Sequence, residues 1–207
     1  MRSFTHHPTK TLIVGASGYG KSQYQIRAAL ASPARLKFVF DHKHEFATLA
    51  GSDQCRTFDE IEAAVPSGWV VFNPHHLFPG ELTQGFNFFA DFAWQFSEGI
   101  GFEKLFVADE LSLLTEGGNP PELCRLMEDG RSVRLDCLMT SHGANSLHNR
   151  IRGQFTEIVS FFQRSEPAIE VMEKEFDFDG EVLRSLDRGE FCAQNLETGR
   201  FVGGRVF

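Results

Sequence analysis

Near the start of the chain stands the octapeptide Gly15-Ala16-Ser17-Gly18-Tyr19-Gly20-Lys21-Ser22. It matches the pattern G-x-x-x-x-G-K-[S/T] at every fixed position, between an apolar run and a segment of helix-forming composition. Its glycines let the backbone curl so that successive N–H groups point at a phosphate, and the helix start adds a partial positive charge. The octapeptide is therefore a Walker A phosphate-binding loop, and we expect all eight residues to contact a nucleotide. Lys21 would bridge the terminal phosphates, and Ser22 would hold Mg²⁺.

Outward from this loop, short apolar runs alternate with segments of helical composition. The apolar runs predict strands at residues 10–14, 36–41, 69–73, 104–109, 134–140 and 156–163. Helices are expected at residues 21–31, 58–65, 87–98, 121–129 and 167–176, and a hairpin at residues 190–195 and 200–206. Near-continuous apolar strands that alternate with helices indicate a mostly parallel sheet covered on both faces. We predict a single α/β domain over residues 1–207, finished by a C-terminal antiparallel hairpin.

The composition fits a folded protein and limits its partners. Of the 207 residues, 42% are hydrophobic and 23% are charged, which excludes a wholly disordered chain, and the 22 phenylalanines are expected to fill a core. The net charge of −8 argues against a nucleic-acid binder of the usual basic kind. However, residues 131–152 hold four arginines and one aspartate, a local net charge of +3, so a basic strip on an acidic body stays open.

Four cysteines without a C-x-x-C pair favour reduced thiols in a cytosolic protein. No apolar run reaches the ~18 residues of a membrane-spanning helix, and the first residues do not resemble a signal peptide. The histidine pairs His42/His44 and His75/His76 lack a third ligand at zinc-like spacing, so solvated loop histidines are the favoured interpretation. His6 and His7 are expected in a tail or near the first strand.

A second chemical motif follows the fourth apolar run, where Leu105-Phe106-Val107-Ala108 leads into Asp109 and Glu110. An acid at the end of a second buried strand holds Mg²⁺ in phosphate-binding-loop proteins, which assigns Asp109 to the Walker B motif and to the metal. An adjacent glutamate is typical of motor-type ATPases, in which it polarises the attacking water, so Glu110 is the predicted catalytic carboxylate. The alternative is a solvated residue that opens a loop.

Two further segments carry a family resemblance. Asp41-x-Lys43-x-Glu45 resembles the D-x-K-x-E segment that follows the second strand in the HerA–FtsK superfamily of DNA-pumping ATPases. Residues 130–142, which begin Gly130-Arg131 and end Thr140-x-His142, resemble the superfamily's Gly-Arg helix end and its strand that finishes in Thr/Ser-x-Gln. The resemblance covers residues 11–162. It is strongest to the small genome-packaging ATPases of membrane-containing icosahedral double-stranded DNA viruses, and it implies a RecA-like P-loop NTPase fold.

The resemblance also implies residue roles. Arg131 would act on the nucleotide of a neighbouring subunit, with Arg134 as the competing choice. His142 would sense the γ-phosphate. The sequence departs from the family twice: His142 replaces the usual glutamine, although an imidazole can also donate to a phosphate, and Tyr19 replaces a small residue inside the phosphate-binding loop.

The function so implied is ATP hydrolysis, with Mg²⁺, coupled to the pumping of double-stranded DNA into a viral capsid without sequence specificity. A ring of five or six copies is expected, without a transmembrane segment of its own. Its partner would be a capsid vertex or a membrane-associated portal protein, and it would lie in the host cytoplasm during assembly and then at the packaging vertex of the virion. Arg150 and Arg152 would line the DNA channel or lie at an interface or on the surface.

Two other classes of nucleotide-binding protein are alternatives to the DNA-pumping ATPase. A P-loop kinase for a nucleoside or another small molecule needs an arginine-rich lid over the phosphates, and no compact cluster of arginine and lysine resembles one. A nucleotide switch of the GTPase kind needs an N/T-K-x-D base-reading motif, which the sequence lacks.

Overall fold

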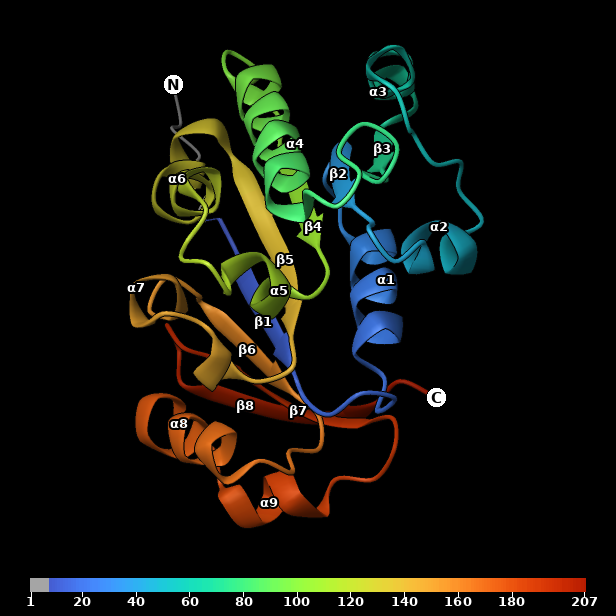
Figure 1. Cartoon of the computed structure of the whole chain (residues 1–207). Coiled ribbons are helices and arrows are strands. Elements are labelled where there is room, and N and C mark those ends of the chain that lie inside the picture. Colours follow the sequence, from blue (N-terminus) through green and yellow to red (C-terminus); the bar gives the residue numbers. More distant parts are fainter. Residues whose placement is uncertain (1–7) are drawn as a thin grey trace. The chain divides into compact units, whose positions relative to one another are not determined.

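The computed structural model describes residues 8–207. The backbone groups into two compact units. Unit 1 contains Ser32–Val107 and Pro120–Cys137 together with the described residues up to Thr9. Unit 2 contains Lys10–Ala31, Ala108–Asn119 and Leu138–Phe207. Each unit is described by itself, with the element labels of Figure 1.

The strands form one eight-stranded mixed sheet in the order β3-β2-β4-β5-β1-β6-β7-β8. Their bounds are β1 Lys10–Val14, β2 Leu36–Phe40, β3 Trp69–Phe72, β4 Lys104–Ala108, β5 Leu135–Ser141, β6 Glu157–Ser160, β7 Glu190–Asn195 and β8 Arg200–Arg205. The helices are α1 Lys21–Ala31, α2 Glu45–Ala50, α3 Phe58–Ala64, α4 Leu82–Ser97, α5 Leu111–Thr115, α6 Pro121–Asp129, α7 Asn149–Arg152, α8 Glu166–Phe176 and α9 Gly180–Ser185. The predicted fold class, a mostly parallel α/β sheet with a C-terminal antiparallel hairpin, is confirmed.

Unit 1 is built around phenylalanine. Strands β2 and β3 pair in parallel, with Phe38 beside Val70 and Phe40 beside Phe72. Helix α4 begins five residues earlier than predicted, at Leu82, and so includes Gly85. A Cβ on Gly85 would lie 2.6 Å from Cβ of Pro74, so glycine is retained there for close packing despite its poor helix propensity.

The fully buried phenylalanines of unit 1 share one apolar cluster. They come from strands β2, β3 and β4 and from helix α4, and they are Phe38, Phe40, Phe72, Phe86, Phe89 and Phe106. Ring centroids lie 5.1 Å apart between Phe72 and Phe89 and 5.8 Å apart between Phe89 and Phe106. These are ordinary distances for packed aromatic pairs. The phenylalanine-rich composition therefore builds a core, as expected.

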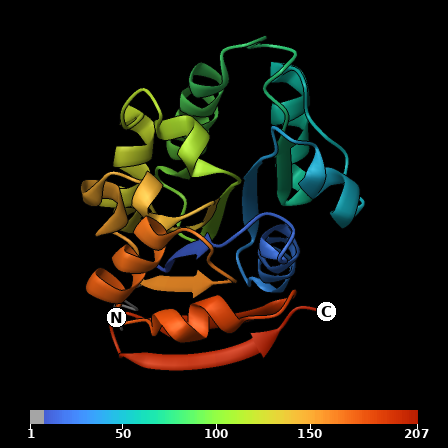
Figure 2. The same ribbon diagram turned by 60° about the horizontal axis from the view of Figure 1, so that its bottom comes forward.

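Unit 2 carries the predicted hairpin. Strand β6 pairs with β1 in parallel, whereas β7 is antiparallel to β6 and β8 is antiparallel to β7. Figure 2 shows β8 along one edge, with α8 and α9 beside the hairpin. Phe178, which lies between these helices, packs edge-on against Phe201 of β8 at 5.3 Å between ring centroids.

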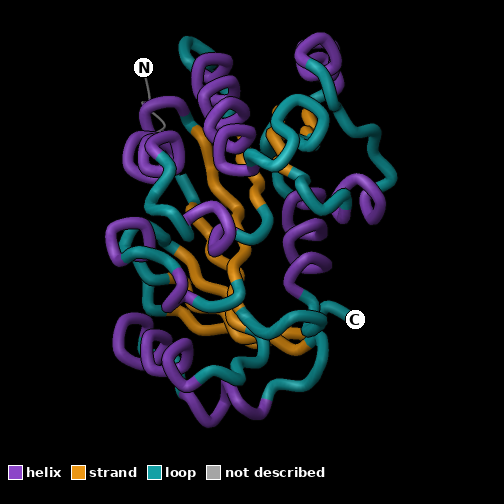
Figure 3. The backbone as a smooth tube through the Cα atoms, viewed as in Figure 1, coloured by secondary structure: helices purple, strands orange, loops and turns teal. Residues whose placement is uncertain are grey.

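The sequence missed the short helices α2, α5, α7 and α9, each of four to six residues (Figure 3). Such helices depend on side-chain caps more than on propensity. Helix α2 is an example, because the carboxylate of Asp41 accepts hydrogen bonds from the backbone N–H groups of Phe46 (3.1 Å) and Ala47 (2.9 Å). Among the described residues, no helix is both long and apolar enough to cross a membrane.

Candidate functional site

The phosphate-binding loop lies in unit 2, between the end of β1 at Val14 and the start of α1 at Lys21. Gly15 has a φ of +144°, and a Cβ on it would lie 2.7 Å from Cβ of Phe161. Gly20 has a φ of +118°. Both conformations exclude most side chains. The loop therefore has the backbone that the motif requires, on the strand–loop–helix frame that the sequence predicted.

Lys21 is folded across the start of this loop. Its ammonium donates hydrogen bonds to the carbonyl oxygens of Gly15 (2.7 Å) and Ala16 (3.3 Å), and the residue is 8% exposed. Ser22 follows in the first turn of α1. The cation is thus held against the backbone at the start of the loop.

Helix α1 is tied to the acidic motif by a residue that the sequence analysis missed. The buried amide of Gln25 donates hydrogen bonds to the carbonyl oxygens of Ala108 (2.9 Å) and Leu138 (3.2 Å). Ala108 is the last residue of β4, and Asp109 and Glu110 follow it directly. Gln25 therefore fixes the helix that begins with Lys21 against the strand end that carries both acids.

Glu110 is buried and held in an unusual backbone conformation. Its side chain is almost fully enclosed, at 2% exposure for the residue, and its φ of 57° and ψ of 59° lie in the left-handed region. The backbone N–H of Glu110 donates to Oγ1 of Thr140 at 2.8 Å. Left-handed backbone at a residue other than glycine costs free energy, of the order of 1–3 kcal/mol, and is found at functional sites. The alternative interpretation of Glu110 as a solvated loop residue does not fit this burial.

Thr140 is hydrogen-bonded to both Asp109 and Glu110, a role that the sequence did not predict. This fully buried residue of β5 accepts the Glu110 N–H, and its hydroxyl donates a short hydrogen bond to Oδ1 of Asp109. A hydroxyl has only one proton, so donation to Asp109 leaves its lone pairs for the Glu110 N–H. The available signal was a polar residue near the end of the apolar run Leu138-Met139-Thr140-Ser141.

The carboxylate of Glu110 has a neighbour on each oxygen. Ser112 donates from its hydroxyl to Oε1 at 2.6 Å. Nε2 of His142 lies 3.4 Å from Oε2, and the His142 side chain is 57% exposed. The structure thus brings Glu110 and His142 together, as two of the predicted catalytic residues. An oriented, buried carboxylate of this kind can accept a proton from water.

The residues predicted for Mg²⁺ are hard oxygen donors in the same unit. Ser22 offers a hydroxyl at the start of α1, and Asp109 offers a carboxylate at the end of β4. Magnesium in phosphate-transfer sites takes one or two protein carboxylates, and substrate phosphates and water complete its shell. Within residues 8–207, no cluster of three or more histidine, cysteine, aspartate or glutamate side chains has metal-binding geometry. The donor chemistry fits magnesium.

The two arginines that competed for the finger role lie in unit 1. Arg134 has a φ of +54°, donates to the carbonyl oxygen of Gly101 at 2.8 Å and lies 3.6 Å from the Glu103 carboxylate. Arg131, in the preceding 3-10 turn Gly130–Val133, is exposed. Arg134 therefore stabilises its own loop, whereas Arg131 is presented to solvent.

The structure corrects the expectation for Arg152. Its side chain is only 11% exposed; Nε donates to Oε2 of Glu175 at 2.6 Å, and Nη1 donates to the carbonyl oxygen of Leu147 at 2.8 Å. This guanidinium braces α7 against α8, so it is not the exposed residue that a channel lining needs. Arg150 is exposed. The pairing was not visible in the sequence because Glu175 lies 23 residues away.

A second correction concerns His42, which was expected to be a solvated loop residue. It is 8% exposed, and its ring packs near Phe40 with 6.0 Å between ring centroids. Nε2 of His75 lies 2.9 Å from the His42 carbonyl oxygen, and Nδ1 of His44 lies 2.7 Å from Oε1 of Gln54. The interpretation of His6 and His7 falls outside the described residues.

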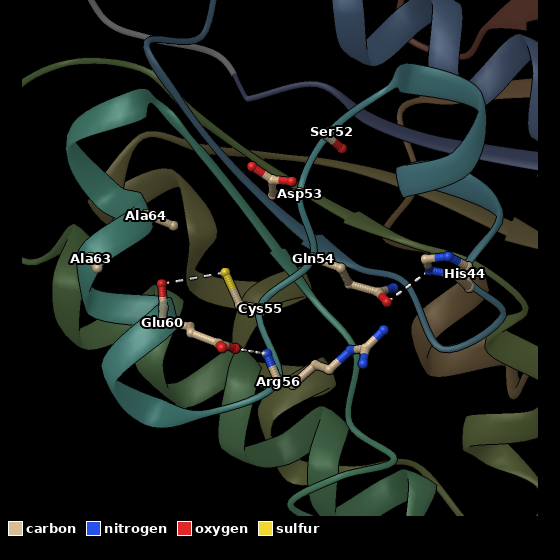
Figure 4. Close-up of a pocket in the computed structure, with 9 residues that line it drawn as sticks. All are labelled: His44, Ser52, Asp53, Gln54, Cys55, Arg56, Glu60, Ala63 and Ala64. Atoms are coloured by element: carbon tan, nitrogen blue, oxygen red, sulfur yellow. Dashed lines mark hydrogen bonds between the residues drawn. The ribbon is translucent and has the colours of Figure 1, made fainter.

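Unit 1 also contains an open hollow of about 680 Å³ around residues 52–56 and helix α3 (Figure 4). The close-up shows hydrogen bonds between Arg56 and Glu60, between Cys55 and Glu60, and between His44 and Gln54. Glu60 accepts from the backbone N–H of Arg56 at 2.6 Å, and Cys55 Sγ lies 3.4 Å from the Glu60 carbonyl oxygen. Thr57 and Glu60 form the capping box that starts α3. These polar groups have structural roles.

No protein-family model matches the sequence, and no curated protein matches it. Solved structures do match the fold. The genome packaging NTPase B204 from Sulfolobus turreted icosahedral virus 2, in complex with ATP-gammaS, is 15% identical with a TM-score of 0.70, covering 97% of this chain and 98% of that chain. The DNA-packaging ATPase B204 from Sulfolobus turreted icosahedral virus is 16% identical with a TM-score of 0.67, covering 96% and 98%.

VirB4 of Thermoanaerobacter pseudethanolicus is 11% identical with a TM-score of 0.70, covering 96% of this chain and 89% of that chain. At such low identities, these likenesses show the fold. The predicted resemblance to packaging-type P-loop ATPases is confirmed at that level, and it extends over the described chain beyond residue 162, where the sequence resemblance ended.

Proposed function

We propose that this chain is an ATP-hydrolysing DNA translocase, and that it packages double-stranded DNA into a viral capsid. The observation that carries the proposal is the acid pair beside the phosphate-binding loop. Glu110 is 2% exposed, and Thr140 joins its backbone to the carboxylate of Asp109. A kinase or a nucleotide switch has no use for a second buried carboxylate at that strand end.

The site residues of unit 2 have distinct tasks in this mechanism. The loop N–H groups and Lys21 bind the triphosphate, and Ser22 and Asp109 would hold magnesium, which when bound neutralises charge on the phosphates. Glu110 orients a water molecule and accepts its proton. Ser112 and His142 lie against the Glu110 carboxylate and would hold it in place, and His142 is the proposed γ-phosphate sensor in place of glutamine.

The exposed Arg131 supports assembly into a ring. A guanidinium that its own unit leaves in solvent can reach a nucleotide held by another copy, where it offsets the charge that develops on the transferred phosphoryl group. Hydrolysis would then depend on assembly. Rings of five or six copies around the duplex remain part of the proposal, as do a capsid-vertex or portal partner and residence in the host cytoplasm before the virion.

Sequence-independent binding of duplex DNA is the remaining component. The two similar viral proteins are a genome packaging NTPase and a DNA-packaging ATPase, which supports this component, and the likeness covers nearly the full length of both chains. Phosphate-backbone binding weakens steeply with salt as counterions are released. In that stretch we propose Arg150, which is exposed on α7, as a residue that contacts DNA.

The test is the ATPase rate of the assembled protein with two duplexes of unrelated sequence at low and moderate salt. We expect equal stimulation by both duplexes, less stimulation at the higher salt, and a smaller response for Arg150→Ala. Arg200→Ala, on the exposed edge strand β8, is the matched control. A rate that DNA leaves unchanged in verified rings, but that a nucleoside acceptor raises, would favour the kinase instead.

A further inference from the structure

An aromatic side chain lies inside the phosphate-binding loop, and it has a partner. The rings of Tyr19 and Phe162 are stacked, with 4.6 Å between centroids and 16° between planes. Both residues are only half-buried. Tyr19 is two residues before Lys21, and Phe162 follows β6. The pair therefore presents aromatic surface at the rim of the loop that binds phosphate.

This pair is fixed to the loop by the backbone. The carbonyl oxygen of Phe162 accepts a hydrogen bond from the N–H of Ala16 at 2.9 Å. On the other side, the N–H of Gly189 donates to the carbonyl oxygen of Tyr19 at 3.0 Å, and Nε of Arg188 donates to the carbonyl oxygen of Gly18 at 2.8 Å. These hydrogen bonds hold the backbone of both residues to the loop region, and the two rings stack on each other.

A third ring stands beside the same turn. Phe207 is 55% exposed, and its ring is so close to Gly20 and Gly189 that a Cβ on either would lie 3.4 Å and 2.9 Å from it, respectively. Exposed aromatic rings offer faces on which another planar ring can stack. The rings of Tyr19, Phe162 and Phe207 thus gather around the outer turn of the loop, Gly18–Gly20.

We infer that Tyr19, Phe162 and Phe207 form a stacking platform for the nucleobase of the triphosphate whose phosphates the loop binds. The inference rests on the proposed nucleotide-binding function and adds the recognition of the base to it. A nucleoside triphosphate held by its phosphates places its base one ribose away from the loop, within reach of rings that are attached to the loop itself. Tyr19, a departure from the family pattern, then has a role.

Such a platform also sets the class of ligand. Stacking recognises the π-face that every base has and is tolerant of base identity, in contrast to hydrogen bonds that read a base edge. The platform therefore takes nucleoside triphosphates as a class, with little discrimination between adenine and guanine. The loss of one stacking ring is expected to weaken binding about tenfold.

The test compares ligands that share phosphates and differ in the base. Calorimetric titrations with Mg²⁺ would measure the affinities of ATP, GTP and inorganic tripolyphosphate for the whole chain and for Tyr19→Leu, Tyr19→Phe and Phe207→Ala. Tyr19→Leu should weaken ATP and GTP about tenfold and leave tripolyphosphate unchanged. Tyr19→Phe should bind like the unchanged protein, and Phe207→Ala should weaken both nucleotides by a smaller factor.

The matched control is Phe201→Leu, which alters an exposed phenylalanine of the same unit on β8 and should change none of the three affinities. Retained tripolyphosphate binding shows that each variant is folded. If Tyr19→Leu and Phe207→Ala weaken no ligand, or weaken all three equally, the platform is overturned while the phosphate site stands. If the unchanged protein binds neither ATP nor tripolyphosphate, the proposed function and the platform are both overturned.

Discussion

The two units bury different mixtures of side chain, although unit 1 also buries polar groups such as Asp41 and Lys104. In unit 1 the largest fully buried residues are phenylalanines such as Phe38, Phe72 and Phe89, packed between strands and α4. In unit 2 buried polar groups gather around the phosphate-binding loop and the strand ends beside it, and they include Lys21, Gln25, Glu110, Thr140, Ser141, Ser160 and Gln163. Burying polar groups costs free energy unless each has a partner, whereas an apolar core needs only volume and shape.

This contrast separates a scaffold from a chemical centre. Aromatic packing tolerates replacement by apolar side chains of similar size, with a modest loss of stability. A hydrogen-bonded set such as Asp109–Thr140–Glu110 has one arrangement, and the loss of one member disturbs the others. Substitutions in the aromatic core of unit 1 should therefore act on stability, and substitutions around the loop in unit 2 should act on turnover.

The largest effect is expected for Lys21→Ala. It removes the one side-chain charge that the loop directs at the phosphates, so the affinity for ATP should fall about a hundredfold or more. Titration calorimetry with ATP and Mg²⁺ measures this. Lys174→Ala, a lysine of α8 in the same unit paired with Glu170 on the surface, is the matched control and should bind normally. Undiminished affinity and turnover in Lys21→Ala would refute the phosphate-site assignment.

Thr140→Val tests the link between the two acids. The variant keeps the shape but removes the hydroxyl that serves Asp109 and the Glu110 N–H. We expect turnover to fall about tenfold or more, as for other partners of metal-site residues, with KM for ATP nearly unchanged. Thr140→Ser, which retains the hydroxyl, should recover most of the rate. Equal losses in Thr140→Ser and Thr140→Val would show that packing, and not the hydrogen bonds, matters there.

Phe89→Leu is the corresponding test in unit 1. Phe89 is fully buried and contacts Phe38, Phe72 and Phe106. The change should lower the free energy of unfolding by about 1–2 kcal/mol. The turnover of the folded protein should stay the same. Chemical denaturation and the ATPase rate measure the two quantities, and a large loss of turnover with unchanged stability would contradict the separation of roles.

The smallest effect is a pH dependence from Lys104 in unit 1. Its Nζ donates to the carbonyl oxygens of Ser97 (3.2 Å) and Ile100 (2.9 Å), and burial, with a smaller contribution from Arg134, lowers its pKa to about 8. The unfolded chain then binds more protons than the native state between about pH 8 and pH 10.5, so stability from this group rises with pH in that window, by about 1 kcal/mol per unit at most.

The difference between the unchanged protein and Lys104→Met isolates that contribution. Burial raises the pKa of Cys192 to about 11, so this thiol lowers stability with rising pH, and it does so equally in both proteins. Denaturant unfolding at pH 7.5, 8.5 and 9.5 gives the free energy of unfolding at each pH. Between these values it should rise more steeply with pH in the unchanged protein than in Lys104→Met. Parallel slopes would mean that Lys104 titrates normally.

Elements with strong local signals could be predicted from the sequence. Helices α1 and α6 were placed to the residue, because a glycine-rich loop begins one and Pro121 begins the other. Strand β6 ends at Ser160, three residues before its predicted end. The predicted strand was too long because Phe161 and Phe162 are apolar, although they belong to the loop beside the phosphate site.

The partners of the site residues could not be predicted, since they come from distant parts of the chain. Thr140 is 30 residues from Glu110, and Gln25 is 83 residues from Ala108. The pairing of Arg152 with Glu175 and the burial of His42 were missed for the same reason. A sequence pattern shows which groups are present, whereas their hydrogen bonds depend on the order of strands in the sheet.

We propose above that Glu110 is the base that takes a proton from water during ATP hydrolysis, and that it does not merely support the structure. The most direct measurement is ATP binding and single-turnover hydrolysis in Glu110→Gln, which keeps the size of the side chain and one hydrogen-bond acceptor but cannot take a proton from water. We expect Glu110→Gln to bind ATP with an affinity within a few-fold of that of the unchanged protein, and to hydrolyse it more slowly by about 10²–10⁴-fold. Hydrolysis at an unchanged rate, with ATP bound normally, would contradict this proposal.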